Sequence, residues 1–431
     1  MTNNNSNQKQ DNLLNIAKNV LPGGTLGNPA PKNLVIDKGL GSHIWDIAGN
    51  EYIDYLLGSG PMLLGHSNPK IVEAVKSQVE KGSTFFALNE NAILLADEIV
   101  KAVPCADQVR FVSSGTEATF FALRAVRAFR KRDKILKFEG GYHGMHDYAN
   151  MSLAPKKLID LPKGLPDSPG IPESVIDEVL VAPFNDLEFT TQLIEKHHDE
   201  LAGVIVEPLQ RVIQPIDGFL QGLRDITKHY DIPLIFDEIV TGFRLAYGGG
   251  QEYYGVTPDL ATYGKVIAGG HPLAAIAGKE YIMNHFNPNV VSPENAIMQV
   301  GTLSGNPVAA AAGLASLEIL KEPNFYKDLF NKGERLQKAL EDTFNELKPE
   351  TPVKVPGEPP CFDLYFCDSE IINYRSTFNA DKIKLLKFNS LLLERGIFKG
   401  DSKYYISSTL TENDIAQTIN AFHEAVELLD K

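Results

Sequence analysis

Residues 109–130 read VRFVSSGTEATFFALRAVRAFR, and this stretch decides the fold. The apolar run Val109–Ser113 predicts a short buried strand, and Gly115–Arg130 has the apolar spacing of an amphipathic helix with several arginines outward. A strand that leads directly into a helix is the repeating unit of a parallel sheet that helices cover on both faces.

The same alternation of short apolar runs and helical patterns continues to about residue 320. Further strands are predicted at Lys134–Phe138, Val179–Pro183, Gly203–Val206, Ile232–Phe236 and Pro272–Ala277. Further helices are predicted at Leu187–His197, Leu220–Tyr230 and Pro307–Leu320. We therefore expect an α/β fold with a mostly parallel sheet, in which ligands bind outside the carboxyl ends of the strands.

The two ends of the chain differ from this central part. The first ten residues are polar and predict a loose tail. Residues 42–55 predict a hairpin, and the last hundred residues predict a mixture of helices and short strands. We expect three parts: an N-terminal segment 1–60 that joins the small domain, a large domain 61–322 and a small C-terminal α+β domain 323–431.

Composition excludes several classes of function. The net charge of -14 argues against nucleic-acid binding, and no apolar run reaches the roughly 18 residues that span a bilayer. The three cysteines form no C-x-x-C pair, and the histidines at 143, 146, 197 and 198 lack a convincing third ligand, so no metal site is expected. The N-terminus does not resemble a signal peptide, so a cytoplasmic location is expected.

Two clusters of polar residues follow predicted strands. Ser113–Ala118, SSGTEA, joins a strand to a helix and predicts a phosphate cradle, because a helix start offers free N–H groups; the alternative is an ordinary helix cap. Asp237 comes directly after the apolar run IPLIF, where a carboxylate can keep a pyridine ring nitrogen protonated. The alternative for Asp237 is a structural cap or salt bridge.

Two further clusters contain glycine. Lys265 stands in the apolar stretch YGKVIAGG, where burial would lower the pKa of the amine and favour imine formation; the alternative is a lysine whose head reaches solvent. Tyr142 stands in GGYHG and offers an aromatic face that can stack on a flat cofactor, although a packed loop tyrosine would look the same.

The ordered set SSGTEA, GGYHG, VEP, FDEIVTGFR, YYGVTPDLATYGKVIAGG and GTLSGNPVAAAAG resembles the class III pyridoxal-phosphate aminotransferases of fold type I. The resemblance runs from about Leu21 to the C-terminus, and it is nearest to glutamate-1-semialdehyde aminomutases. It implies pyridoxal phosphate as the cofactor and a large domain built on a seven-stranded, mostly parallel sheet.

The resemblance also assigns roles to residues. Lys265 matches the Schiff-base lysine and Asp237 the partner of the ring nitrogen. The other matches concern cofactor binding: Ser114, Gly115 and Thr116 for the phosphate, Tyr142 and Ile239 for the two ring faces, Glu207 beside the cofactor, and Thr302 for the phosphate of a neighbouring subunit. A homodimer with shared active sites follows from the last assignment.

Two departures lie on the substrate side. After Pro22–Gly24 the aminomutases carry S-P-V-R, whereas this chain continues TLGNPAPKN without arginine, and residues 400–411, GDSKYYISSTLT, lack the glutamate and histidine of the aminomutases. Arg211 is the candidate to hold an anionic group of the substrate, unless it pairs with Glu207 or another local acid. The favoured function is an aminotransferase acting on an amino acid or amine and a keto acid or aldehyde. An aminomutase, a lyase on the same cofactor and an inert relative are the alternatives.

Overall fold

The computed structural model describes residues 2–28, 31 and 33–431. Two compact units contain these residues: a small unit of residues 1–69, 324–370 and 379–431, and a large unit of residues 70–323 and 371–378. Residues 371–378 thus belong to the large unit, although the chain before and after these eight residues belongs to the small unit. No pattern in the sequence pointed to this excursion.

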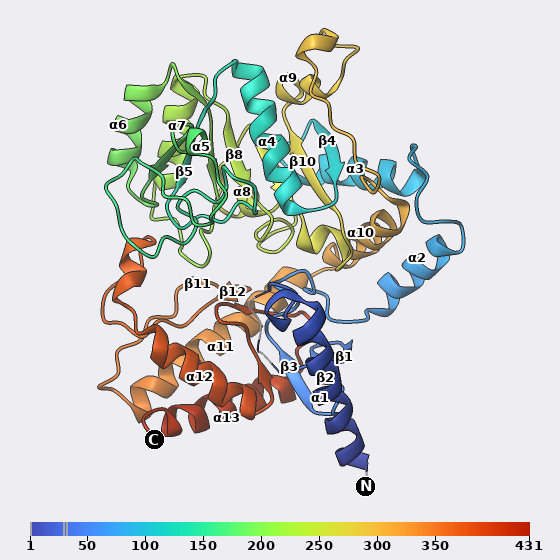
Figure 1. Cartoon of the computed structure of the whole chain (residues 1–431), viewed down its shortest axis with the longest axis vertical. Coiled ribbons are helices and arrows are strands. Elements are labelled where there is room, and N and C mark those ends of the chain that lie inside the picture. The colour runs from blue at the N-terminus through green and yellow to red at the C-terminus, as the bar shows by residue number, and fades with distance from the viewer. Residues whose placement is uncertain (1, 29–30, 32) are drawn as a thin grey trace. The chain divides into compact units, whose positions relative to one another are not determined.

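The large unit is built on the expected sheet (Figure 1). Its seven strands, in spatial order, are β4 (Gln108–Val112), β10 (Ala274–Gly278), β9 (Leu260–Tyr263), β8 (Leu234–Asp237), β7 (Leu201–Val206), β5 (Lys134–Phe138) and β6 (Val179–Ala182). Only β10 runs antiparallel to its neighbours, and the other adjacent pairs are parallel. The predicted α/β class with a mostly parallel seven-stranded sheet is confirmed.

Helices cover this sheet because its strands are buried on both faces. The helices of the large unit are α2 (Pro69–Val79), α3 (Glu90–Ala102), α4 (Gly115–Arg130), α5 (Glu173–Ile176), α6 (Leu187–His197), α7 (Phe219–His229), α8 (Gly250–Tyr253), α9 (Glu280–Met283) and α10 (Pro307–Leu320). Helix α4 packs against β7, β9 and β10, and α6 lies beside α7, as Figure 1 shows.

Helix α10 fixes the turn that follows β9. It is rich in alanine, almost entirely buried, and packed against the single 3₁₀ turn η2 (Lys265–Ala268). Gly313 is required at this contact, since a Cβ there would lie 2.5 Å from the carbonyl oxygen of Ile267. The close approach holds the start of η2, and therefore Lys265, against the end of the sheet.

The small unit combines both ends of the sequence. Strand β3 (Glu51–Asp54) of the expected N-terminal hairpin pairs in parallel with β13 (Ile397–Phe398), beside β2 (His43–Asp46) and β1 (Ile36–Leu40). Its other elements are the strands β11 (Gly357–Glu358), β12 (Cys361–Phe362) and β14 (Tyr404–Tyr405) and the helices α1 (Thr2–Val20), α11 (Phe325–Leu347), α12 (Lys382–Glu394) and α13 (Glu412–Leu428).

The predicted loose tail at the N-terminus was wrong, because residues 2–20 form one helix, α1. Its second half contains Leu13, Leu14 and Ala17, which are good helix formers, and adding residues to an existing helix costs little. The helix therefore extends into the polar stretch. Of the segment TLGNPAPKN, residues 29, 30 and 32 lie outside the described residues.

Within the described residues, no helix combines the length and apolar character needed to cross a bilayer. The same residues contain no group of three or more His, Cys, Asp or Glu side chains arranged to hold a metal ion.

Candidate active site

Asp237 and Lys265 lie at the carboxyl ends of two adjacent parallel strands. Asp237 is the last residue of β8, and it pairs in register with Thr262 of β9. The Thr262 hydroxyl donates a hydrogen bond to Asp237 Oδ1 at 3.1 Å. Lys265 follows Thr262 by three residues, so the strand pairing brings the aspartate and the lysine to one edge of the sheet.

The backbone at Lys265 has an unusual conformation. Its φ of 49° lies in the left-handed region, which residues with a side chain rarely adopt, and such strain gathers at functional sites. Gly264 precedes it with an extended backbone, and a Cβ on Gly264 would approach Ile239 Cδ1 to 3.1 Å. The lysine is half-buried in a tightly packed turn and does not lie on an open surface.

Asp237 is a buried carboxylate with three hydrogen-bond donors. His143 Nδ1 lies 2.8 Å from Oδ2, and the backbone N–H of Ile239 donates to Oδ1 at 3.2 Å, in addition to the bond from Thr262. Both Asp237 and His143 are almost fully buried. Because a carboxylate only accepts, Nδ1 carries the proton.

The imidazole of His143 therefore orients the carboxylate, and His143 Nε2 has no hydrogen-bond partner among the described residues. Sequence reasoning interpreted this histidine as solvated or structural and missed its partner. The signal was present, because GGYHG follows β5 and Asp237 ends β8, and the two strands flank β7 in the sheet.

The expected phosphate cradle lies at the start of α4. The Ser114 hydroxyl caps the helix by accepting from Glu117 N at 3.3 Å, while Glu117 accepts from the backbone N–H of Ser113 and Ser114. The Ser114 side chain is thus engaged as a cap. Gly115 and Thr116 are the first two residues of the helix, so their N–H groups have no intrahelical acceptor. Gly115 also lets the helix approach Ile239, whose Cδ1 would lie 3.1 Å from a Cβ there.

Tyr142 presents an accessible ring, which is 39% exposed. Its backbone N–H donates to Glu207 Oε1 at 2.6 Å, and Glu207 Oε2 accepts from the backbone N–H of Arg211 at 3.2 Å. The Arg211 guanidinium carbon lies 5.0 Å from the centre of the Tyr142 ring, and Arg211 Nε donates to Gly140 O at 3.1 Å. Glu207 thus ties the Tyr142 loop to the segment of Arg211 through backbone groups, and the guanidinium itself contacts that loop.

A buried lysine that the sequence did not single out supports the same loop. Lys137, at the end of β5, donates from Nζ to the carbonyl oxygens of Gly141, Ala149 and Met151 at 3.1, 2.8 and 2.6 Å. Burial, together with the nearby charge of Arg211, lowers the pKa of the Lys137 amine to about 7, against the opposing effect of Asp167 and Glu207.

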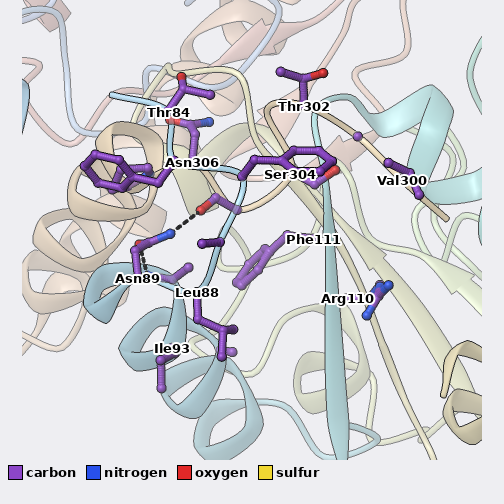
Figure 2. A pocket seen from close by; sticks show the side chains of 18 of the residues that line it. Thr84, Leu88, Asn89, Ile93, Arg110, Phe111, Val300, Thr302, Ser304 and Asn306 are labelled. Carbon is purple, nitrogen blue, oxygen red and sulfur yellow. Dashed lines mark hydrogen bonds between the residues drawn. The ribbon is translucent and has the colours of Figure 1, made fainter. Parts of the chain in front are cut away.

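Thr302 has an exposed side chain. It lines a pocket of about 530 Å³ together with residues from 84–89, 109–111, 299–301 and 304–307 (Figure 2). Sequence analysis placed it with the cofactor of a neighbouring subunit, and its exposure leaves the hydroxyl accessible to another molecule.

The residues at this sheet edge fit a phosphorylated pyridine aldehyde. The N–H groups at the start of α4, which have no intrahelical acceptor, would suit a phosphate, the buried carboxylate of Asp237 would suit a pyridinium, and the amine of Lys265 would suit an aldehyde. A mixed sheet of this strand order with the lysine on the turn after β9 defines a pyridoxal-phosphate protein of fold type I.

The chain belongs to the class-III aminotransferase family, whose model matches residues 27–362. It is 42% identical to the glutamate-1-semialdehyde 2,1-aminomutase of Methanocaldococcus jannaschii over 98% of this chain and 99% of the relative. The fold is similar to that of an omega-transaminase from Sphaerobacter thermophilus, with a TM-score of 0.91 and 34% identity over 98% of each chain. A solved transaminase with pyridoxal phosphate bound has a TM-score of 0.89 and 28% identity, again over 98% of each chain. The expected cofactor, pyridoxal phosphate, is confirmed by this family membership.

Proposed function

We propose that this protein is an aminotransferase that moves an amino group between an amino acid or amine and a keto acid or aldehyde. The observation that carries the proposal is the buried Asp237, clamped by His143, at the strand end next to Lys265. A carboxylate at this position would keep the ring nitrogen of the cofactor protonated, and the substrate-side departures from the aminomutases favour transfer between two molecules.

Each residue has a role in this proposal. Bound pyridoxal phosphate supplies an aldehyde for covalent attachment and a ring that accepts the electron pair released at a substrate carbon. Lys265 Nζ would hold the cofactor covalently until the amine of the substrate displaces it, and the freed Lys265 amine would then carry the proton at the reacting carbon. Asp237 keeps the proton on the ring nitrogen, because an ion pair in a dry site is strong.

The remaining groups hold and orient the cofactor. The N–H groups of Gly115 and Thr116, at the turn that begins with Ser114, donate to the phosphate. Tyr142 and Ile239 cover the two faces of the ring, with Glu207 fixing the backbone of Tyr142. Arg211 supplies positive charge beside Tyr142, where it can bind an anionic group of the substrate.

A second candidate is a glutamate-1-semialdehyde 2,1-aminomutase. A relative with that name is 42% identical over nearly the whole chain, which is the observation in its favour. The two candidates differ in whether the amino group leaves the first molecule for good. An aminomutase returns it to the same carbon skeleton, whereas an aminotransferase needs a separate acceptor.

Incubation of the holoenzyme with glutamate-1-semialdehyde distinguishes the candidates. The aminotransferase proposal predicts that product forms only when a keto acid or aldehyde acceptor is supplied together with an amine donor. Steady formation of 5-aminolevulinate from glutamate-1-semialdehyde alone, at about 1 per second or faster, would establish the aminomutase and end the aminotransferase proposal.

We also propose that the working unit is a homodimer. The pocket that contains Thr302 is lined by exposed apolar side chains, including Phe86, Leu88 and Val300, at 71%, 89% and 65% exposure. Figure 2 shows Leu88 and Val300 at this pocket. Apolar surface of this kind marks a protein interface. A second copy seated here would bring its own Thr302 toward the neighbouring cofactor.

A further inference from the structure

Residues 371–378, which we call the strap, come from the C-terminal part of the sequence but belong to the large unit. The strap lies against loops that follow β5 and β6. Asn185 Nδ2 donates to Ile372 O at 2.8 Å, and the Tyr374 hydroxyl donates to Pro155 O at 3.1 Å. Arg375 Nη2 donates to Ile159 O at 2.7 Å. These contacts fix the strap at the same sheet edge as the candidate active site.

The strongest contact of the strap is an ion pair with two parallel hydrogen bonds. Arg375 Nε donates to Glu139 Oε2 at 2.7 Å, and Nη2 donates to Oε1 at 3.1 Å. Glu139 is 1% exposed, and among the described residues only Arg375 donates to its carboxylate. Removing one partner of a buried pair leaves an uncompensated charge, so this contact determines where Glu139 lies.

The strap also packs on the residue after Glu139. Gly140 has a φ of 83°, and a Cβ there would lie 2.5 Å from the ring carbon Cδ2 of Tyr374. Only glycine therefore allows the Tyr374 ring to sit at this position. Two consecutive residues of the loop, Glu139 and Gly140, contact two consecutive residues of the strap.

The other side of this loop is held by residues 210 and 211. Gln210 Nε2 donates to Glu139 O at 2.8 Å, and Arg211 Nε donates to Gly140 O. Glu139 and Gly140 are thus held on one side by the strap and on the other by residues 210 and 211. Tyr142 follows Gly140 by two residues, and its backbone N–H donates to Glu207. Tyr142 therefore follows a segment that is held on both sides and is itself held at its backbone N–H.

We propose that Tyr374 and Arg375 are positioning residues that, through Gly140 and Glu139, set the Tyr142 ring for stacking on the cofactor. The proposal rests on the proposed role of Tyr142. It makes cofactor affinity depend on a segment that lies more than two hundred residues from Tyr142 in the sequence.

The test measures binding of pyridoxal phosphate to the apo-protein by fluorescence titration, together with the visible circular dichroism that the bound cofactor acquires. Arg375→Gln should raise the cofactor Kd about three- to tenfold, the scale of a lost aromatic stacking contact, and weaken the dichroism. Arg375→Lys keeps the charge and should recover part of the affinity. Arg395→Gln is the matched control, because Arg395 pairs with Glu424 at 3.0 Å in the small unit; it should leave Kd unchanged.

A double-mutant comparison decides whether the strap acts through Tyr142. In a Tyr142→Ala background, Arg375→Gln should raise Kd no further, since the stacking ring is already gone. If Arg375→Gln unfolds the apo-protein, Tyr374→Leu serves as the test variant instead, because it keeps the ion pair of Arg375 and Glu139. Tyr374→Leu should likewise raise Kd in the wild-type background and raise it no further in the Tyr142→Ala background. An equal increase of Kd in both backgrounds, or an unchanged Kd in the background that contains Tyr142, would overturn the proposal. Wild-type protein that binds no pyridoxal phosphate would instead refute the proposed function.

Discussion

Replacing Asp237 with asparagine removes the proposed ring partner while keeping its shape. The amide oxygen of Asn still accepts from Ile239 N and Thr262 Oγ1, which donate to Oδ1 at 3.2 and 3.1 Å in the wild type. The negative charge is lost, and the amide NH₂ now faces His143 Nδ1, which donated to the carboxylate at 2.8 Å. His143 must then move its proton to Nε2, which has no partner among the described residues.

Two effects follow from this change. A pair of opposite charges about 4 Å apart contributes roughly 4 kcal/mol at an effective dielectric constant of about 20, which corresponds to about a thousandfold in rate. The unpartnered Nε2–H in a buried site should lower the free energy of unfolding by about 1–3 kcal/mol. Asp237→Asn should therefore be less stable but folded, and about a thousandfold slower in the half-reaction with an amine donor.

Stopped-flow absorbance in a single turnover measures this half-reaction. Glu238→Gln is the matched control, because Glu238 is the adjacent buried carboxylate and accepts from Thr241 Oγ1 at 2.9 Å and Gln251 Nε2 at 3.0 Å. It should lose stability without a comparable loss of rate per folded molecule. A half-reaction of Asp237→Asn within about tenfold of wild type, or an equal collapse in Glu238→Gln, would refute the assigned role.

Three further predictions concern the neighbouring groups. Arg211→Lys should weaken an anionic substrate by about 1–3 kcal/mol and a neutral amine hardly at all, as KM measurements with both would show; equal losses would make Arg211 structural. Thr302→Val should raise the cofactor Kd while sedimentation still shows a dimer, and a fully active monomer would end the shared-site proposal. The pKa of Lys137 is about 7 in the folded state and 10.5 ordinarily, so between pH 7 and pH 10.5 the folded state binds fewer protons than the unfolded state. The contribution of Lys137 to the free energy of unfolding therefore rises with pH in this range. Between about pH 7 and pH 9, the free energy of unfolding of Lys137→Met, measured with denaturant, should rise less than that of the wild type. The same rise in both proteins would contradict the lowered pKa of Lys137.

Local patterns predicted much of the sheet and its helices. Helix α4 begins at Gly115 because Ser114 and Glu117 form a capping box, and that pattern is visible in SSGTEA. Strand β9 was not identified as a strand, although the lysine after it was, because the buried run Leu260–Tyr263 has only four residues and no alternation. The reactive motifs were therefore easier to recognise than the strand that positions one of them.

Contacts between distant parts of the sequence could not be predicted in the same way. The pair of Glu139 and Arg375 joins residues 236 positions apart, and neither lies in a motif. The contact of His143 with Asp237 depends on the order of β5, β7 and β8 in the sheet, which single-strand patterns do not specify. Lys137 looked like an ordinary strand residue until three carbonyl oxygens were found around its amine.

The central claim is that Lys265 holds the cofactor, and borohydride reduction of the holoenzyme tests it most directly. Reduction makes the covalent link permanent, and peptide mapping by mass spectrometry then locates the pyridoxyl group. Lys137 is the natural rival, because burial lowers the pKa of its amine to about 7 and it lies beneath the Tyr142 loop. The account predicts a pyridoxyl group on Lys265 alone, whereas a label on Lys137 or any other lysine would contradict it.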